Sequence, residues 1–178
     1  RGAARAGNRW GGRLEPPGRR TFEVTLPRRG GLGVVVASLP RAPGAALYRH
    51  LEAMMAGLGM AESILGILPE GLILPEAFAL LDDHLELLPT HPLPESAVVA
   101  FSWRLLAVLG EIPPTESWPT GIASELGPWL SDPDGTEPPG LLSAAEWVAG
   151  LLQAASGRPL RGRMLWKQVR RDLPDGGH

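Results

Sequence analysis

Polar and apolar residues alternate near the start of the chain, between residues 21 and 26. Threonine or glutamate occupies the odd positions, and apolar residues occupy the even ones. This period of two predicts a strand with one buried face. Residues 28 to 31, Arg-Arg-Gly-Gly, interrupt the alternation, and β-branched residues resume it from 33 to 39. The pattern therefore predicts two strands joined by a glycine turn.

From about residue 44 the apolar spacing changes to three and four residues, which is typical of amphipathic helices. Gly57 and Gly59 are expected to break the first helix, and a second should then run to about Leu68. The apolar positions of the first helix are Leu47, Leu51, Met54, Met55 and Leu58. Further helices are predicted for residues 75 to 88, 94 to 110 and 143 to 156, with a basic one from 160 to 173.

Residues 94 to 110 are predicted to form the central helix, because their sequence is apolar nearly all round and other helices should surround it. The last apolar helix should begin at Ser143, since Glu146 follows three residues later and completes a capping box. In the helix from 75 to 88, the stripe expected to face the core is Phe78, Leu81, Leu85 and Leu88.

Residues 111 to 140 form a long insert that fits neither pattern. The insert is rich in proline and glycine and also carries Trp118 and Trp129. Irregular segments of this length within a domain are uncommon and indicate either function or disorder. We therefore expect one mainly helical domain, residues 41 to 178, that is interrupted by this insert.

Charge is segregated along the chain, although the net charge is only −2. Residues 1 to 49 hold ten arginines and two acids, a net charge of +8. Residues 50 to 157 hold fifteen acids and one arginine, a net of −14, and residues 158 to 178 have a net of +4. Coding bias towards arginine would not separate the signs in this way. Two basic ends around an acidic middle indicate contact with nucleic acid.

The candidate DNA-binding side chains are the cations at both ends of the chain. Guanidinium groups pair with phosphates, and a tryptophan between arginines can stack on an unpaired base. Trp10 has this setting, and packing on the sheet is the alternative role for it. The predicted DNA-binding residues are Arg5, Arg9, Trp10, Arg13, Arg19, Arg20, Arg28, Arg29, Arg161, Arg163 and Lys167.

Arg104 stands inside the apolar run of the central helix. One interpretation is that its side chain extends to solvent or pairs with an acid from a neighbouring helix. The other is that it forms a cationic socket for the carboxylate of a protein partner. Arg104 is therefore the candidate partner-binding residue.

The sequence contains no recognisable catalytic or metal-binding arrangement. The Gly-Gly-Leu-Gly run at residues 30 to 33 lacks the Lys-Ser/Thr of a phosphate-binding loop and precedes a strand. The four histidines show no metal-ligand spacing, and the chain has no cysteine. No nucleophile elbow is present. We expect a protein that is not an enzyme and that needs no cofactor and no metal.

Length and composition set further bounds on the chain. Its 178 residues, of which 44% are hydrophobic, suffice for an ordinary globular core. We find no apolar run long enough to span a membrane and no signal peptide. Because the chain begins with Arg1, its true start is expected to lie upstream. A cytoplasmic, nucleoid-associated location is the expectation.

The order of these features resembles the RecO family of bacterial recombination mediators. The resemblance rests on short runs spread over nearly the whole chain, and their order and spacing carry it. These runs are Gly-Arg-Leu-Glu-Pro at 12 to 16, Phe-Glu-Val at 22 to 24, Gly-Leu-Gly at 31 to 33, Ala-Ser-Leu at 37 to 39, Tyr-Arg-His at 48 to 50, Ala-Glu-Ser-Ile-Leu at 61 to 65, Ala-Phe-Ser-Trp-Arg-Leu-Leu at 100 to 106 with Gly110, Pro113 and Pro114, and Arg-Pro-Leu-Arg-Gly-Arg at 158 to 163.

The resemblance implies an α+β, mainly α fold, with a partial N-terminal OB-fold β-sheet in residues 1 to 40 and an all-helical C-terminal domain. It implies binding and annealing of single- and double-stranded DNA without catalysis, and help in loading recombinase. The implied partners are RecR and the tail of the single-stranded-DNA-binding protein, with RecF and RecA as further candidates. A helical adaptor whose basic ends bind an acidic protein is the alternative function.

Two departures from the family pattern change these expectations. Many members carry four cysteines of a zinc module in the insert, whereas residues 115 to 140 contain none, so zinc is expected to be absent. The chain also begins where the family would be in mid-barrel. The early OB-fold strands are therefore expected to be missing, which would leave an open sheet with exposed edges.

Overall fold

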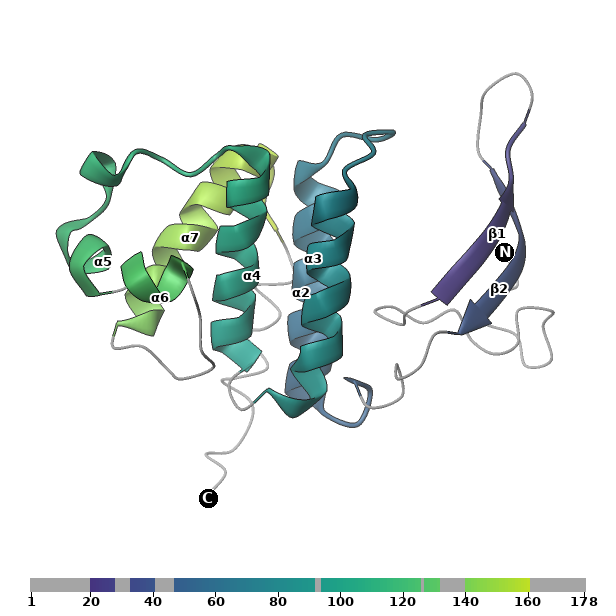
Figure 1. Cartoon of the computed structure of the whole chain (residues 1–178), viewed down its shortest axis with the longest axis horizontal. Helices are drawn as coiled ribbons and strands as arrows, with labels where there is room; N and C mark the ends of the chain where they lie inside the picture. Colours follow the sequence, from purple (N-terminus) through teal and green to yellow (C-terminus); the bar gives the residue numbers. More distant parts are fainter. Residues whose placement is uncertain are drawn as a thin grey trace.

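The computed structural model has a small antiparallel sheet followed by helices (Figure 1), which confirms the predicted α+β, mainly α class. Residues 20–27, 33–40, 47–91, 94–125, 127–131 and 140–160 are those that the structure describes. The elements in chain order are β1 Arg20–Thr25, β2 Val34–Pro40, α2 Leu51–Ile67, α3 Pro75–Leu87, η1 Leu88–Thr90, α4 Pro94–Leu109, η2 Thr115–Ser117, α5 Thr120–Glu125, α6 Gly127–Ser131 and α7 Leu141–Ser156.

Strands β1 and β2 pair antiparallel, as the alternation predicts, with Phe22 opposite Ser38 and an irregularity in register between Glu23 and Val24. The expectation of a buried face is wrong. Phe22 is 46% exposed and Val24 45%, because the hairpin stands apart from the helices (Figure 1). A two-stranded sheet without a covering layer is marginally stable in water. The OB-fold itself stays a prediction.

Helix α2 is continuous, and the expected break at Gly57 and Gly59 is wrong. Each glycine in a helix interior costs about 1 kcal/mol relative to alanine. Gly57 is buried, and Gly59 lies where α2 meets its neighbours. Close packing along the same helix, with Met60 fully buried, offsets the low helix propensity of these glycines.

Helix α3 has nearly the predicted bounds but a different buried face. Phe78 is 64% exposed, while Ala77 and His84 are buried together with Leu85 and the adjoining Leu88. The sequence stripe follows the large apolar residues, but the structure buries the small Ala77 completely and leaves the larger Phe78 exposed. His84 lies about two turns after Ala77 on α3. Its ring contacts that of Phe101 edge-on, with 5.4 Å between ring centroids.

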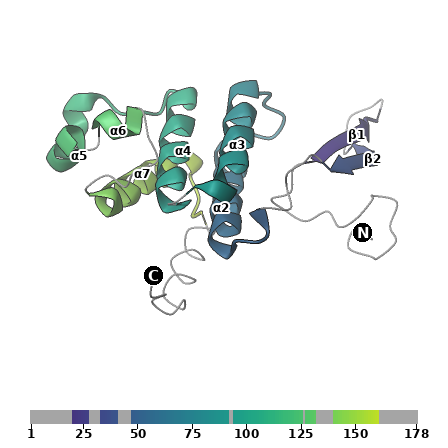
Figure 2. The ribbon, with the colours of Figure 1, turned by 60° about the horizontal axis from the view of Figure 1, so that its bottom comes forward.

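Helix α4 is the centre of the helical body, as predicted. It packs against α2, α3 and α7, and Figure 2 shows it between α3 and α7. Helix α7 begins at Leu141 after Gly140, whose φ of 79° is left-handed. The capping box predicted at Ser143 is therefore not the start of this helix. The buried residues of α4 are Ser96, Ala97, Val99, Ala100, Phe101, Ser102, Trp103, Leu105 and Leu106.

The insert between α4 and α7 is partly helical and packs on the body, so the expectation of an irregular segment is wrong for its described residues. It contains η2, α5 and α6, and it buries Ile122 and Leu130. The ring centroid of Trp118 lies 4.9 Å from that of Trp103 and 5.4 Å from that of Trp147. Apolar side chains therefore hold the insert against α4 and α7.

A fall in pH from 7.5 to 5.5 is expected to destabilise the fold through His84. Desolvation by burial lowers the pKa of His84 from its ordinary value of 6.5; the Nδ1–H bond to the Leu80 carbonyl opposes this, and nearby Arg104 adds to it. The unfolded chain then binds this proton at a higher pH than the folded chain does. The contribution of His84 to the free energy of unfolding is complete above about pH 6.5 and is lost as the pH falls below that value.

Urea unfolding of the wild type and of His84→Gln at both pH values would measure this effect. The pH-dependent part of the free energy of unfolding should shrink in His84→Gln and persist in His50→Gln, which changes an exposed histidine. Equal pH dependence in all three proteins would show that His84 is not the group responsible.

Candidate nucleic-acid interface and a helical groove

Most of the predicted DNA-binding side chains lie outside the described residues, so their shared surface stays a prediction. Arg20 is the one predicted DNA contact that falls inside them. The others are Arg5, Arg9, Trp10, Arg13, Arg19, Arg28, Arg29, Arg161, Arg163 and Lys167.

Arg20 is the first residue of β1, and its side chain is anchored across the sheet. Its Nε donates a hydrogen bond of 2.6 Å to Oγ of Ser38 on β2. Ser38 is only 8% exposed, so this bond fixes the direction of the half-buried arginine. A guanidinium carries five N–H donors, and the bond to Ser38 uses one of them. Arg20 thus places an oriented cation at the start of the hairpin.

Arg104 lies half-buried on α4, on the side that meets α3. Its charge acts on His84, where it helps to lower the pKa of the imidazole. Asp83 acts on the same imidazole in the opposite direction and raises its pKa, so Arg104 shares this seam with an acidic residue. The role of Arg104 in binding a partner stays a prediction.

The described part of the chain offers no metal centre and no membrane span. Among these residues, no group of three or more His, Cys, Asp or Glu is placed to hold a metal ion. None of the described helices is long and apolar enough to cross a bilayer. The site on this chain is therefore sought in charged and apolar surfaces.

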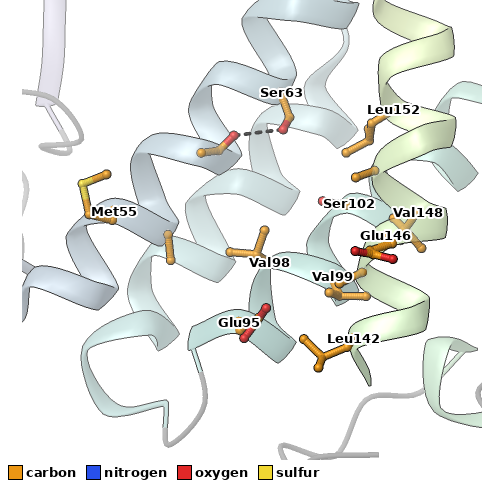
Figure 3. A pocket seen from close by; sticks show the side chains of 14 residues that line it. Met55, Ser63, Glu95, Val98, Val99, Ser102, Leu142, Glu146, Val148 and Leu152 are labelled. Atoms are coloured by element: carbon orange, nitrogen blue, oxygen red, sulfur yellow. Dashed lines mark hydrogen bonds between the residues drawn. The ribbon is translucent and has the colours of Figure 1, made fainter. Parts of the chain in front are cut away.

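A groove with a cavity of about 130 Å³ lies where α2, α4 and α7 meet (Figure 3). Helix α2 contributes the floor around Gly59 and Ser63, and the Ser63 hydroxyl donates a 2.9 Å hydrogen bond to the Gly59 carbonyl. Because that hydroxyl is satisfied within its own helix, the floor is effectively apolar. The remaining lining residues are Met55, Ala56, Glu95, Val98, Val99, Ser102, Leu142, Ala145, Glu146, Val148, Ala149 and Leu152.

Two carboxylates give this groove a negative rim. Glu95 on α4 and Glu146 on α7 line it, and both appear in Figure 3 towards the end that holds Leu142. The lining contains no lysine or arginine, and Arg104 does not belong to it. An apolar hollow with an acidic rim suits an apolar side chain that has cations beside it.

Our sequence analysis missed this groove. Its signal was present as small residues at helical spacing, Ala56 with Gly59 on α2 and Ala145 with Ala149 on α7. Small side chains repeated along one face leave room between packed helices. Glycine was expected only as a helix breaker, so its role in leaving this space was not predicted.

Comparison with known protein families decides the identity of the helical body. The model described as "Recombination protein O C terminal" matches residues 48–160. The match covers more than half of the chain and takes in every helix from α2 to α7. The chain belongs to the RecO family. The suspected RecO resemblance is thereby confirmed.

RecO-family membership gives the chain a role in DNA recombination and repair. The matched residues 48–160 include the groove lining and Arg104, whereas the hairpin with Arg20 precedes them. No curated protein and no solved structure gave a significant match to the chain. The RecO C-terminal match is therefore the comparison on which the family assignment rests.

Proposed function

We propose that this RecO-family chain is a non-enzymatic mediator of recombinational DNA repair. It binds and anneals DNA, and it helps to load recombinase onto single strands coated by the single-stranded-DNA-binding protein. The match of residues 48–160 to the RecO C-terminal family carries this proposal. The segregation of charge, with both basic ends outside the acidic middle, supports it.

The charge distribution assigns DNA binding to the basic ends of the chain and not to the helical body. Residues 50 to 157 carry a net charge of −14, so this helical body repels phosphate groups. DNA is therefore held by the basic ends, with the oriented guanidinium of Arg20 at the start of the hairpin. Two complementary strands that meet on one cationic surface lose part of their mutual repulsion, and no covalent chemistry is needed for annealing.

The helical body serves protein partners in this proposal. The partners are RecR and the tail of the single-stranded-DNA-binding protein, with RecF and RecA as further ones, at the nucleoid in the cytoplasm. Arg104 is the proposed cationic contact, because it is half-buried on α4 and lies close enough to His84 on α3 to lower the pKa of that imidazole. The RecO match over these helices supports this division of roles.

The binding of single-stranded DNA is expected to depend steeply on salt. If about six cations contact phosphates, the logarithm of the affinity should fall with the logarithm of salt at a slope near −4, or about 300-fold between 50 and 200 mM. Fluorescence anisotropy with a labelled oligonucleotide measures this slope. Replacing Arg9, Arg13 and Arg19 with glutamine should reduce the slope by about 2, and Arg49→Gln provides an exposed control.

Strand annealing separates this proposal from the helical adaptor. A mediator should accelerate the pairing of complementary oligonucleotides at low salt, whereas an adaptor that binds an acidic protein has no reason to do so. An affinity for DNA that ignores salt, or no acceleration of annealing by a chain that binds oligonucleotide, would argue for the adaptor.

A further inference from the structure

The face of α2 that lines the cavity continues towards the end of the helix. Ala56, Gly59 and Ser63 line the cavity, and Gly66 is the next residue on that face, because positions three and four apart share one side of a helix. A Cβ added at Gly66 would come within 2.7 Å of Leu160 Cδ2. Leu160 therefore already covers the far end of the same face.

The chain that follows α7 is held at this point by two contacts. Leu160 packs on Gly66, and Nη2 of Arg158 donates a 2.8 Å hydrogen bond to the carbonyl of Leu65. These contacts bring the chain onto α2 at the end of the groove. Leu160, which precedes the 18 residues beyond the described part, therefore tethers them beside Gly66, one turn beyond Ser63 in the cavity lining.

The size of the cavity sets what can fill it. A cavity of about 150 Å³ between apolar side chains holds a molecule the size of benzene, and this one measures about 130 Å³. It has room for one leucine or methionine side chain. Exposed Leu142, at 67%, extends the apolar surface at the acidic end.

The rim of the groove sets the charge of its occupant. Glu95 and Glu146 each take part in another interaction within the chain, but an ionised carboxylate has about four acceptor sites. Both can therefore also accept hydrogen bonds from a cation. The occupant should carry a small apolar group with lysine or arginine close to it in sequence.

The C-terminal residues have this composition. Met164, Leu165 and Trp166 are consecutive, Arg163 precedes them, and Lys167 follows them. We propose that residues 161–171 of the same chain dock along the groove, with the side chain of Met164 or Leu165 in the cavity and the cations near the acidic rim. This inference goes beyond the proposed function and does not require DNA.

The length of this segment fits the distance to be covered. From Gly66 to Ala56 is ten helical residues, a rise of about 15 Å. Residues 161–171 span about 16 Å as a helix and more than 30 Å when extended, so either conformation reaches the cavity. A tether this short gives the segment an effective concentration in the millimolar range. The same segment of a second copy would therefore compete poorly for the groove.

Disulfide trapping tests the proposal in the full chain, which contains no cysteine of its own. One variant combines Ala149→Cys, in the lining of the groove, with Gln168→Cys. The matched control combines Ala154→Cys with Gln168→Cys. Ala154 is an exposed alanine on the same helix, lies outside the groove and is closer in sequence to the tether.

Docking predicts a faster disulfide in the 149–168 variant than in the 154–168 control, by at least about tenfold, and within single chains at all protein concentrations. A free segment would give the opposite order, because the shorter tether reaches position 154 more readily. That order, or a 149–168 disulfide found mainly between copies, would overturn the proposal. Circular dichroism confirms that each variant keeps its helices.

The charge contribution has its own test in the 149–168 variant. Adding Glu95→Gln and Glu146→Gln should slow disulfide formation several-fold at low salt, and 1 M NaCl should produce a similar slowing without these substitutions. If neither change affects the rate, the acidic rim does not attract the segment and the proposed docking is wrong in its electrostatic part.

Discussion

Replacing Trp103 with alanine is expected to lower the free energy of unfolding by about 3–5 kcal/mol. Trp103 is 5% exposed on α4, and its ring centroid lies 4.9 Å from that of Trp118 and 5.6 Å from that of Trp147. The substitution removes one ring from a cluster of three, and it leaves a cavity between the insert, α4 and α7. We expect this to be among the largest losses at a single position.

Urea unfolding followed by far-UV circular dichroism would measure the change in stability, and near-UV circular dichroism would report the loss of the tryptophan contacts. Phe78→Ala is the control, because it also removes an aromatic ring but at a position that is 64% exposed. Its effect should stay within about 0.5 kcal/mol. A loss below 1 kcal/mol for Trp103→Ala would mean that the cluster does not hold the insert.

The amide protons of the hairpin are expected to exchange with solvent at least about 10³-fold faster than those of α4. Strands β1 and β2 have exposed apolar side chains, including Leu39 at 67%, and two strands without a covering layer open at little cost in free energy. Helix α4 buries residues on most of its surface. Its amides should therefore exchange only when the whole helical body unfolds.

Hydrogen–deuterium exchange with mass spectrometry resolves these peptides in one experiment. Peptides from α3, which packs on α4, serve as the internal reference. Hairpin protection equal to that of α4 would show that another part of the protein covers the strands. Added oligonucleotide should raise hairpin protection if Arg20 and its neighbours bind DNA.

The local patterns predicted the elements well. The alternation of residues 21 to 26 gave β1, and the spacing of apolar residues gave α3, α4 and most of α7 within a few residues. These signals are local, because the period of a strand or a helix is set by its own backbone. The runs shared with RecO led to the same family that the match over residues 48–160 shows.

The errors came from contacts between distant segments. Gly57 and Gly59 lower helix propensity, but local sequence cannot show that α2 as a whole packs against α4 and α7. Phe78 was expected in the core, but the structure exposes it and buries its neighbour Ala77. The groove needs three helices at once, so no single stretch could reveal its acidic rim. Most of the candidate DNA-binding residues lie outside the described residues and still await a test.

The two glycines that bound the insert have a practical consequence. Gly110, with a φ of 72°, directly follows α4, and Gly140, with a φ of 79°, directly precedes α7. A left-handed residue reverses the chain locally, so each helix terminates through its own backbone geometry. The length of the insert can therefore change without rotating α4 or α7. The insert is thus the natural place to graft an epitope tag or a reporter domain for tracking the protein in living cells.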